Sequence, residues 1–261
     1  MSIARHFRTL TVAAALAAAA LSSHAALTTQ LGFAVDASGS IGGANFTIMR
    51  NGYLAALAAL PVDGSIEITM VRFASGADVI VAPTIVTPAT LPGILAAINA
   101  MGFTGGSTAT NLGIDLLAQQ MVASTNFNRT LNSMMNLATD GQPNSQATAL
   151  ASAVAAELSG IDAMTAEAIA APLAAIDNLR DLVFSPLSGP CANCGTVLPD
   201  GSIPPNPMTN LPWVLVVNSF NDFGVAINAK IQASIGRVPE PSALALVGIA
   251  LVGLSLARRR A

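Results

Sequence analysis

Short apolar runs and longer helical runs alternate along most of this 261-residue chain, and this alternation constrains the fold more than any other feature. The apolar runs are rich in β-branched residues and are bounded by Gly, Pro or Asp, as buried strands are. Between them the apolar residues recur at helical spacing. Strands separated by helices of 10–15 residues indicate crossover units. The sequence therefore predicts an α/β fold with a doubly wound, mostly parallel central sheet.

One segment interrupts the alternation. Residues 185–212 contain seven prolines, three glycines and both cysteines, so we expect a loop insertion before the last strand. The expected strands are 31–36, 65–73, 79–86, 131–138, 161–169 and 213–217. The expected helices are 46–60, 91–101, 112–122, 147–158, 173–183 and 220–235.

The N-terminal segment is typical of a secretory signal peptide. Arg5 and Arg8 precede an apolar run at 10–21, and Ser23-His24-Ala25 forms a small-x-small cleavage site. We expect residues 1–25 to be removed on export; an uncleaved membrane anchor is the alternative. Both interpretations place the rest of the chain outside the cytoplasm.

The C-terminal segment has three parts in a fixed order: a Pro-Glu-Pro box, an apolar run and a basic cluster. The apolar run, 242–257, is nearly long enough to span a bilayer as a helix with snorkelling arginines. Residues 238–261 resemble the PEP-CTERM sorting signal, which implies an exosortase-type processing enzyme and a Gram-negative bacterium that makes extracellular polysaccharide. A plain anchor that holds the protein in the inner membrane, facing the periplasm, is the alternative. The residues of the signal are Val238, Pro239, Glu240, Pro241, Arg258, Arg259 and Arg260.

The charges of the middle of the chain exclude several classes of function. Residues 26–238 contain thirteen acidic and six basic residues, so they lack the basic surface that nucleic-acid binding needs. Both histidines, His6 and His24, lie in the signal peptide. The mature chain therefore has no histidine for a catalytic triad or a zinc site. We expect no enzyme activity.

Oxygen-bearing side chains gather at the predicted strand ends. The first strand ends in Asp36-Ala37-Ser38-Gly39-Ser40, a Gly-Gly-Ser-Thr run at 105–108 precedes a helix, and Thr139-Asp140-Gly141 follows a strand. Loops at the carboxyl ends of the strands form the ligand crevice of a doubly wound fold. Carboxylates and hydroxyls without imidazole or thiolate select Mg²⁺, Mn²⁺ or Ca²⁺ over zinc or copper.

These motifs resemble those of the von Willebrand factor type A domain and its metal-ion-dependent adhesion site, over about residues 28–236. The pattern of that site is Asp-x-Ser-x-Ser, then Thr, then Asp. The resemblance implies that the two serines and the threonine touch the cation, most often Mg²⁺, that the aspartates act through water, and that an open position accepts a partner's carboxylate. The corresponding residues are Asp36, Ser38, Ser40, Thr108 and Asp140.

Alternative interpretations remain for some of these residues. Thr110 competes with Thr108 for the metal role, although Thr108 follows the Gly-Gly-x run. The serines of the first loop are also common in helix caps and turns. We expect Asp115 to be a solvated helix residue rather than a sixth ligand.

The two cysteines form a Cys-x-x-Cys pair, Cys191 and Cys194, inside the loop insertion. A redox motif would need a helix directly after a strand, and a zinc site would need two further soft ligands. In an oxidising compartment we expect a local disulfide.

Two functions follow as hypotheses. The first is a surface- or matrix-associated adhesion module whose cation recruits a carboxylate on a protein or a polysaccharide. The second is a structural matrix protein in which the cation only stabilises the fold.

Overall fold

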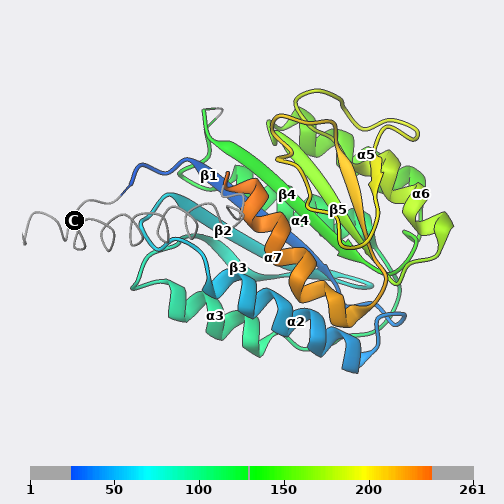
Figure 1. The fold of residues 1–261 in the computed structure, drawn as a ribbon, viewed down its shortest axis with the longest axis horizontal. Helices are drawn as coiled ribbons and strands as arrows, with labels where there is room; N and C mark the ends of the chain where they lie inside the picture. The colour runs from blue at the N-terminus through cyan, green and yellow to red at the C-terminus, as the bar shows by residue number, and fades with distance from the viewer. Residues whose placement is uncertain (1–24, 129, 237–261) are drawn as a thin grey trace, which may run out of the picture.

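The computed structural model describes residues 25–128 and 130–236, and within them a seven-stranded sheet lies between two layers of helices (Figure 1). The strand order is β3-β2-β1-β4-β5-β7-β6, and β3 runs antiparallel to β2 while the other pairs are parallel. This confirms the predicted α/β fold with a mostly parallel sheet. The strands are β1 (Thr29–Asp36), β2 (Ile66–Phe73), β3 (Ala77–Ile85), β4 (Asn132–Thr139), β5 (Ala163–Ile169), β6 (Thr196–Leu198) and β7 (Trp213–Val217).

The helices cover both faces of the sheet. The first face carries α2 (Gly43–Ala58), α3 (Leu91–Ala100) and α7 (Phe223–Ser234), with a short 3-10 turn η1 (Phe220–Asp222) before α7 (Figure 1). The opposite face carries α4 (Thr110–Val122), α5 (Gln146–Leu158) and α6 (Leu173–Leu182). Each layer buries its own apolar cluster against the sheet, which accounts for strands that are apolar on both faces.

The strands that carry the predicted motifs are buried along their length. All eight residues of β1 are buried, and β4 and β5 are buried apart from the first residue of β4. Residues Thr29 to Val35 of β1 pair in register with Asn132 to Ala138 of β4. Asp36 and Asp140 therefore emerge side by side at the same edge of the sheet.

One strand was not predicted. β6 lies inside the segment 185–212 and pairs in parallel with β7 at the edge of the sheet. Three residues are too few to produce a strand signal among so many prolines, so the sequence indicated only a loop.

Several predicted segments lie outside the described residues: the signal peptide except for Ala25, the sorting box and the arginine cluster. The apolar run at 242–257 belongs to the same part of the chain. Among the helices that the structure describes, none is both long and apolar enough to span a membrane.

Candidate metal centre

Asp36 is the centre of the site, at the last position of β1. Its side chain is fully buried, and both carboxylate oxygens accept hydrogen bonds. Oδ1 accepts from the backbone N–H of Ser38 at 2.7 Å, and Oδ2 accepts from Oγ1 of Thr139 at 2.6 Å. These bonds fix the carboxylate between the ends of β1 and β4.

The hydroxyls of the two serines in the loop after β1 lie close together, and one of them bonds to Asp140. The Oγ atoms of Ser38 and Ser40 lie 3.2 Å apart, and Oγ of Ser40 donates to Oδ1 of Asp140 at 2.7 Å. Ser38 is fully buried, whereas Ser40 and Asp140 reach solvent. The hydroxyls of Ser38 and Ser40 therefore lie between the buried Asp36 and the protein surface.

The loop that carries Thr108 is tied to the loop after β1 by its glycines. The N–H of Gly39 donates to the carbonyl of Gly106 at 2.8 Å, and the N–H of Gly105 donates to the carbonyl of Ala37 at 2.9 Å. Gly106 has a φ of 97°, and a Cβ there would lie 2.4 Å from Oγ of Ser75. Only glycine suits this position, because its φ is left-handed and it has no room for a side chain.

Asn144 holds Thr108 from the other side. The N–H of Thr108 donates to Oδ1 of Asn144 at 3.0 Å, and the N–H of Asn144 donates to the carbonyl of Thr108 at 2.9 Å. The Nδ2 of Asn144 also donates to Oγ of Ser107 at 3.0 Å. The threonine is thus positioned between the loops that follow β1 and β4.

The position beside the Cα of Gly141 is bordered by side chains from two different loops. A Cβ placed on Gly141 would lie 3.5 Å from Oγ of Ser40 and 3.7 Å from Oγ1 of Thr108. The two hydroxyl oxygens therefore lie within 4 Å of one point, and Ser40 also bonds to Asp140. Thr110 begins α4 instead, and its buried hydroxyl has no hydrogen-bond partner. Of the two threonines, only Thr108 has its hydroxyl within 4 Å of a Cβ placed on Gly141.

Burial dominates the electrostatics of both aspartates. It raises the pKa of Asp36 from 3.8 to about 6, although the hydrogen bonds from Thr139 and Ser38 act in the opposite direction and the charge of Asp140 adds to the rise. Partial burial also raises the pKa of Asp140, and the hydrogen bond from Ser40 opposes it. A nearby positive charge would favour the ionised form of both groups.

The donor set fits a hard divalent cation. It combines two carboxylates with three hydroxyls, all oxygen, which suits Mg²⁺, Mn²⁺ or Ca²⁺. Within residues 25–128 and 130–236, no group of three or more His, Cys, Asp or Glu side chains could hold a metal ion. A cation at this edge would therefore depend on the serine and threonine hydroxyls as much as on the aspartates.

The sequence did not reveal two residues that shape the site, Thr139 and Asn144. Thr139 precedes Asp140 directly, and its position at a buried strand end was the available signal. Asn144 gave no local signal, because its bonds to Thr108 join segments 36 residues apart.

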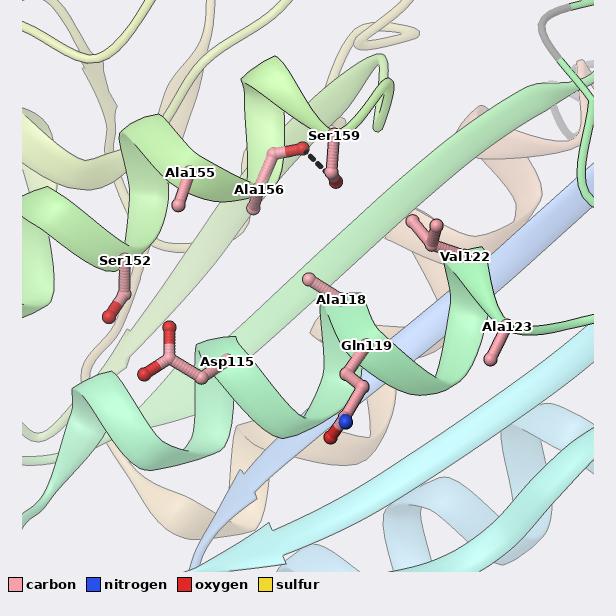
Figure 2. A pocket seen from close by; sticks show the side chains of 9 residues that line it. All are labelled: Asp115, Ala118, Gln119, Val122, Ala123, Ser152, Ala155, Ala156 and Ser159. Atoms are coloured by element: carbon pink, nitrogen blue, oxygen red, sulfur yellow. Dashed lines mark hydrogen bonds between the residues drawn. The ribbon is translucent and has the colours of Figure 1, made fainter.

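Asp115 lies away from the predicted site. It lines a hollow of about 390 Å³ between α4 and α5, and its carboxylate points toward Ser152 of α5 (Figure 2). The other residues that line this hollow are mostly small, including Ala118, Ala155 and Ala156.

Cys191 and Cys194 are joined by a disulfide, with 5.4 Å between their Cα atoms. The loop around it is fastened to the last turn of α6. Nε of Arg180 donates to the carbonyl of Gly195 at 2.9 Å, and the N–H of Asn193 donates to Oδ1 of Asp181 at 2.6 Å. Because α6 starts at the edge of the sheet where Asp36 lies, its last turn is at the far end from the candidate metal centre.

Family models match two parts of the sequence. The model of the von Willebrand factor type A domain matches residues 30–185, and the model of the PEP-CTERM protein-sorting motif matches residues 237–260. A search of curated proteins gave no match.

Solved structures share the fold at low sequence identity. Proximal thread matrix protein 1 from the mussel byssus, in a form described as having a zinc-occupied MIDAS motif, aligns with a TM-score of 0.60 and 16% identity, over 81% of this chain and 48% of that one. The pilus adhesin SpaC from Lactobacillus rhamnosus GG aligns with a TM-score of 0.59 and 16% identity, over 80% of this chain and 30% of the adhesin. BatB from Bacteroides thetaiotaomicron, described as a conserved hypothetical protein, aligns with a TM-score of 0.50 and 14% identity, over 78% of this chain and 97% of BatB. The chain thus spans about half of the mussel protein and less than a third of the adhesin.

Proposed function

Because the chain belongs to the von Willebrand factor type A domain family, we propose that it binds an acidic group of a partner through a divalent cation at the carboxyl edge of its sheet. Its PEP-CTERM motif implies export and sorting to the surface, so the partner would meet it outside the cytoplasm. Domains of this adhesin- and matrix-like kind are generally non-catalytic. The proposed ligands of the cation are Asp36, Ser38, Ser40, Thr108 and Asp140.

One observation supports this proposal: the hydroxyl oxygens of Ser40 and Thr108 lie within 4 Å of the same point at Gly141, and Ser40 bonds to Asp140. In the arrangement we propose, Ser38, Ser40 and Thr108 bind the cation directly, and Asp36 and Asp140 hold it through water. A carboxylate oxygen of the partner would reach the cation from the solvent side, where Ser40 and Asp140 are accessible. We propose Mg²⁺ as the cation, with Mn²⁺ or Ca²⁺ as alternatives.

The helices around the site support an anionic ligand. α2, α4, α5 and α6 all begin at the carboxyl edge of the sheet, and none has an acidic residue in its first turn. The positive ends of their dipoles therefore lie at this edge without compensation by acidic side chains of their own first turns.

A capture experiment tests the binding function. Surface proteins and polysaccharides from the producing cells are passed over the immobilised protein in Mg²⁺ or in EDTA. We expect capture in Mg²⁺ that is lost in EDTA and in the Asp36→Ala variant. The cation could also raise the melting temperature without changing the amount of captured partner. That result would support the alternative function, a structural matrix protein in which the cation only stabilises the fold.

A second experiment tests sorting by an exosortase-type enzyme and attachment through the C-terminal segment. A tag placed before Val238 should be found outside the cytoplasm, and deletion of residues 238–261 should release soluble protein. A truncated protein that stays with the membrane would contradict this part of the proposal.

A further inference from the structure

The sequence contains a single lysine, Lys230, and the fold buries it. Lys230 lies on α7 and is 3% exposed, although a lysine is almost never fully buried unless its charge is paired. Its Nζ lies 2.9 Å from Oε1 of Glu167, which is on β5 and is 0% exposed. The one lysine amine of the chain is therefore enclosed beside a carboxyl group, away from water.

An amide side chain completes this buried group. Asn136 of β4 is 4% exposed. It faces the same side of the sheet as Glu167, because Ala138, two residues further along β4, pairs with Glu167. Asn136 and Lys230 also line one cavity of about 10 Å³, which has room for about one water molecule. The amine, the carboxyl group and the amide therefore come together between α7 and the sheet.

Hydrogen bonds account for only part of this arrangement. Nδ2 of Asn136 donates to the hydroxyl of Tyr53 at 3.2 Å. Oδ1 of Asn136, Nζ of Lys230 and both carboxyl oxygens of Glu167 have no well-directed hydrogen-bond partner among the residues that the structure describes. Buried polar atoms in this condition are costly and rare. The amine and the amide carbonyl are also the two groups that form a new amide bond when they react with each other.

We propose that Lys230 and Asn136 form a covalent amide bond between α7 and β4, with Glu167 as the acid–base group. Nζ adds to Cγ of Asn136, the bond between Cγ and Nδ2 breaks, and the amide nitrogen leaves as ammonia. The ammonium group of Lys230 loses two protons in this reaction. Glu167 keeps one of them as a neutral carboxyl group, and the departing nitrogen takes the other.

The surroundings of the three side chains favour this reaction. Burial lowers the pKa of Lys230 to about 8 and raises that of Glu167, so proton transfer across the 2.9 Å contact gives a nucleophilic amine and a neutral acid. The acid then stabilises the negative charge that develops on Oδ1 of Asn136. Enclosure holds the reacting groups together and excludes the water that would hydrolyse the bond. The product contains no buried charge.

Peptide mapping of the exported wild-type protein tests the proposal. The bond blocks cleavage by trypsin after Lys230, so we expect one branched product in which residues 130–180 are joined to residues 181–237. Its mass should be lower than the sum of the two peptides by one ammonia molecule. An amine-reactive reagent, applied to the denatured protein, should leave position 230 unlabelled. Because the chain has no other lysine, any labelled side chain reports unreacted protein.

Two variants locate the reacting groups. Asn136→Ala removes the amide and Glu167→Ala removes the acid, so both proteins should be cut and labelled at Lys230. Glu157→Ala makes the same change on α5, away from the three side chains, and should keep the branched product. Asn136→Ala also retains the ion pair of Lys230 and Glu167, so this background measures the stability of the ion pair alone.

The wild-type map decides the proposal even if a buried substitution prevents folding. Wild-type protein that is cut after Lys230 and labelled there would overturn it. A branched product that is lighter by one water molecule would also overturn it, because the bond would then join Lys230 to a carboxyl group instead of Asn136.

Discussion

Lys230 on α7 and Glu167 on β5 form an ion pair inside the protein, with 2.9 Å between Nζ and Oε1. Both side chains are almost fully buried, and Nζ also lies 5.2 Å from the centre of the Trp213 ring. Burial lowers the pKa of Lys230 to about 8 and raises that of Glu167, while each charge opposes the shift of the other. The pair therefore links α7 to the sheet at a considerable desolvation cost.

Removal of one partner should destabilise the fold strongly. We expect Lys230→Met to lower the free energy of unfolding by about 3 kcal/mol, because it leaves the Glu167 carboxyl in the core without its cation. The double variant with Glu167→Leu should recover most of this loss. Denaturant unfolding of both variants is the measurement, and a double variant as unstable as the single one would contradict the explanation.

Cation binding should stabilise the wild-type protein and not Asp36→Ala. With a cation at about 100 times its dissociation constant, binding to the folded state alone is worth about 2.7 kcal/mol. We expect the melting temperature to rise in millimolar Mg²⁺ and to return after EDTA. If none of Mg²⁺, Mn²⁺ and Ca²⁺ changes the melting temperature of either wild type or Asp36→Ala, the metal-site hypothesis is wrong.

The cation-free protein should lose stability as the pH rises from about 4 to above 6. The pKa of Asp36 is about 6 in the folded state, against an ordinary value of 3.8. Below both values the carboxyl is protonated in the folded and unfolded chains and contributes nothing; above both it is ionised, and its burial costs up to about 3 kcal/mol.

Chemical denaturation in EDTA at several pH values measures this loss. Asp36→Asn carries no titratable group at that position, so its stability should depend less on pH over the same range. Parallel pH curves for the two proteins would show that other groups, such as Glu167, cause the dependence.

Gly141→Ala should separate cation binding from folding. The added methyl group would lie 3.5 Å from Oγ of Ser40 and 3.7 Å from Oγ1 of Thr108, which are ordinary contact distances. We therefore expect a stable protein whose melting temperature responds less to Mg²⁺, because the methyl occupies the space between the hydroxyls.

Gly93→Ala is the control for Gly141→Ala. Gly93 lies in α3, where a Cβ would meet nothing within 4 Å. This variant should keep the full response to Mg²⁺ and gain about 0.5–1 kcal/mol from the helix propensity of alanine. A normal Mg²⁺ response in Gly141→Ala would argue against the predicted position of the cation.

The disulfide should matter little to the site. Replacing Cys191 and Cys194 with Ser opens a small ring, so the loss of stability should be below the roughly 3 kcal/mol of a 15-residue loop. The Mg²⁺ response should not change, because the loop is fastened to the far end of α6. Alkylation of the exported protein should find no free thiols.

The sequence predicted what local patterns determine. Apolar runs gave the long strands, and the Asp36 and Asp140 motifs placed their carboxylates at strand ends, where parallel pairing brings them together. Two kinds of feature gave no such signal. β6 forms because it pairs with β7. Asn144 contributes to the site because it hydrogen-bonds to Thr108, which is 36 residues away in the sequence. Both depend on tertiary contacts rather than on periodicity.

The two outer strands of the sheet have a consequence for a protein whose sorting motif implies export to the surface. β3 contains Pro83, and β6 has only three residues and is followed by Pro199. Proline offers no N–H to a neighbouring strand, and a short strand offers few groups to pair. Neither β3 nor β6 is therefore a good template for pairing with a strand of a second molecule of this protein. Crowded molecules can therefore stay separate, and any attachment between them must be made elsewhere than by continuation of the sheet.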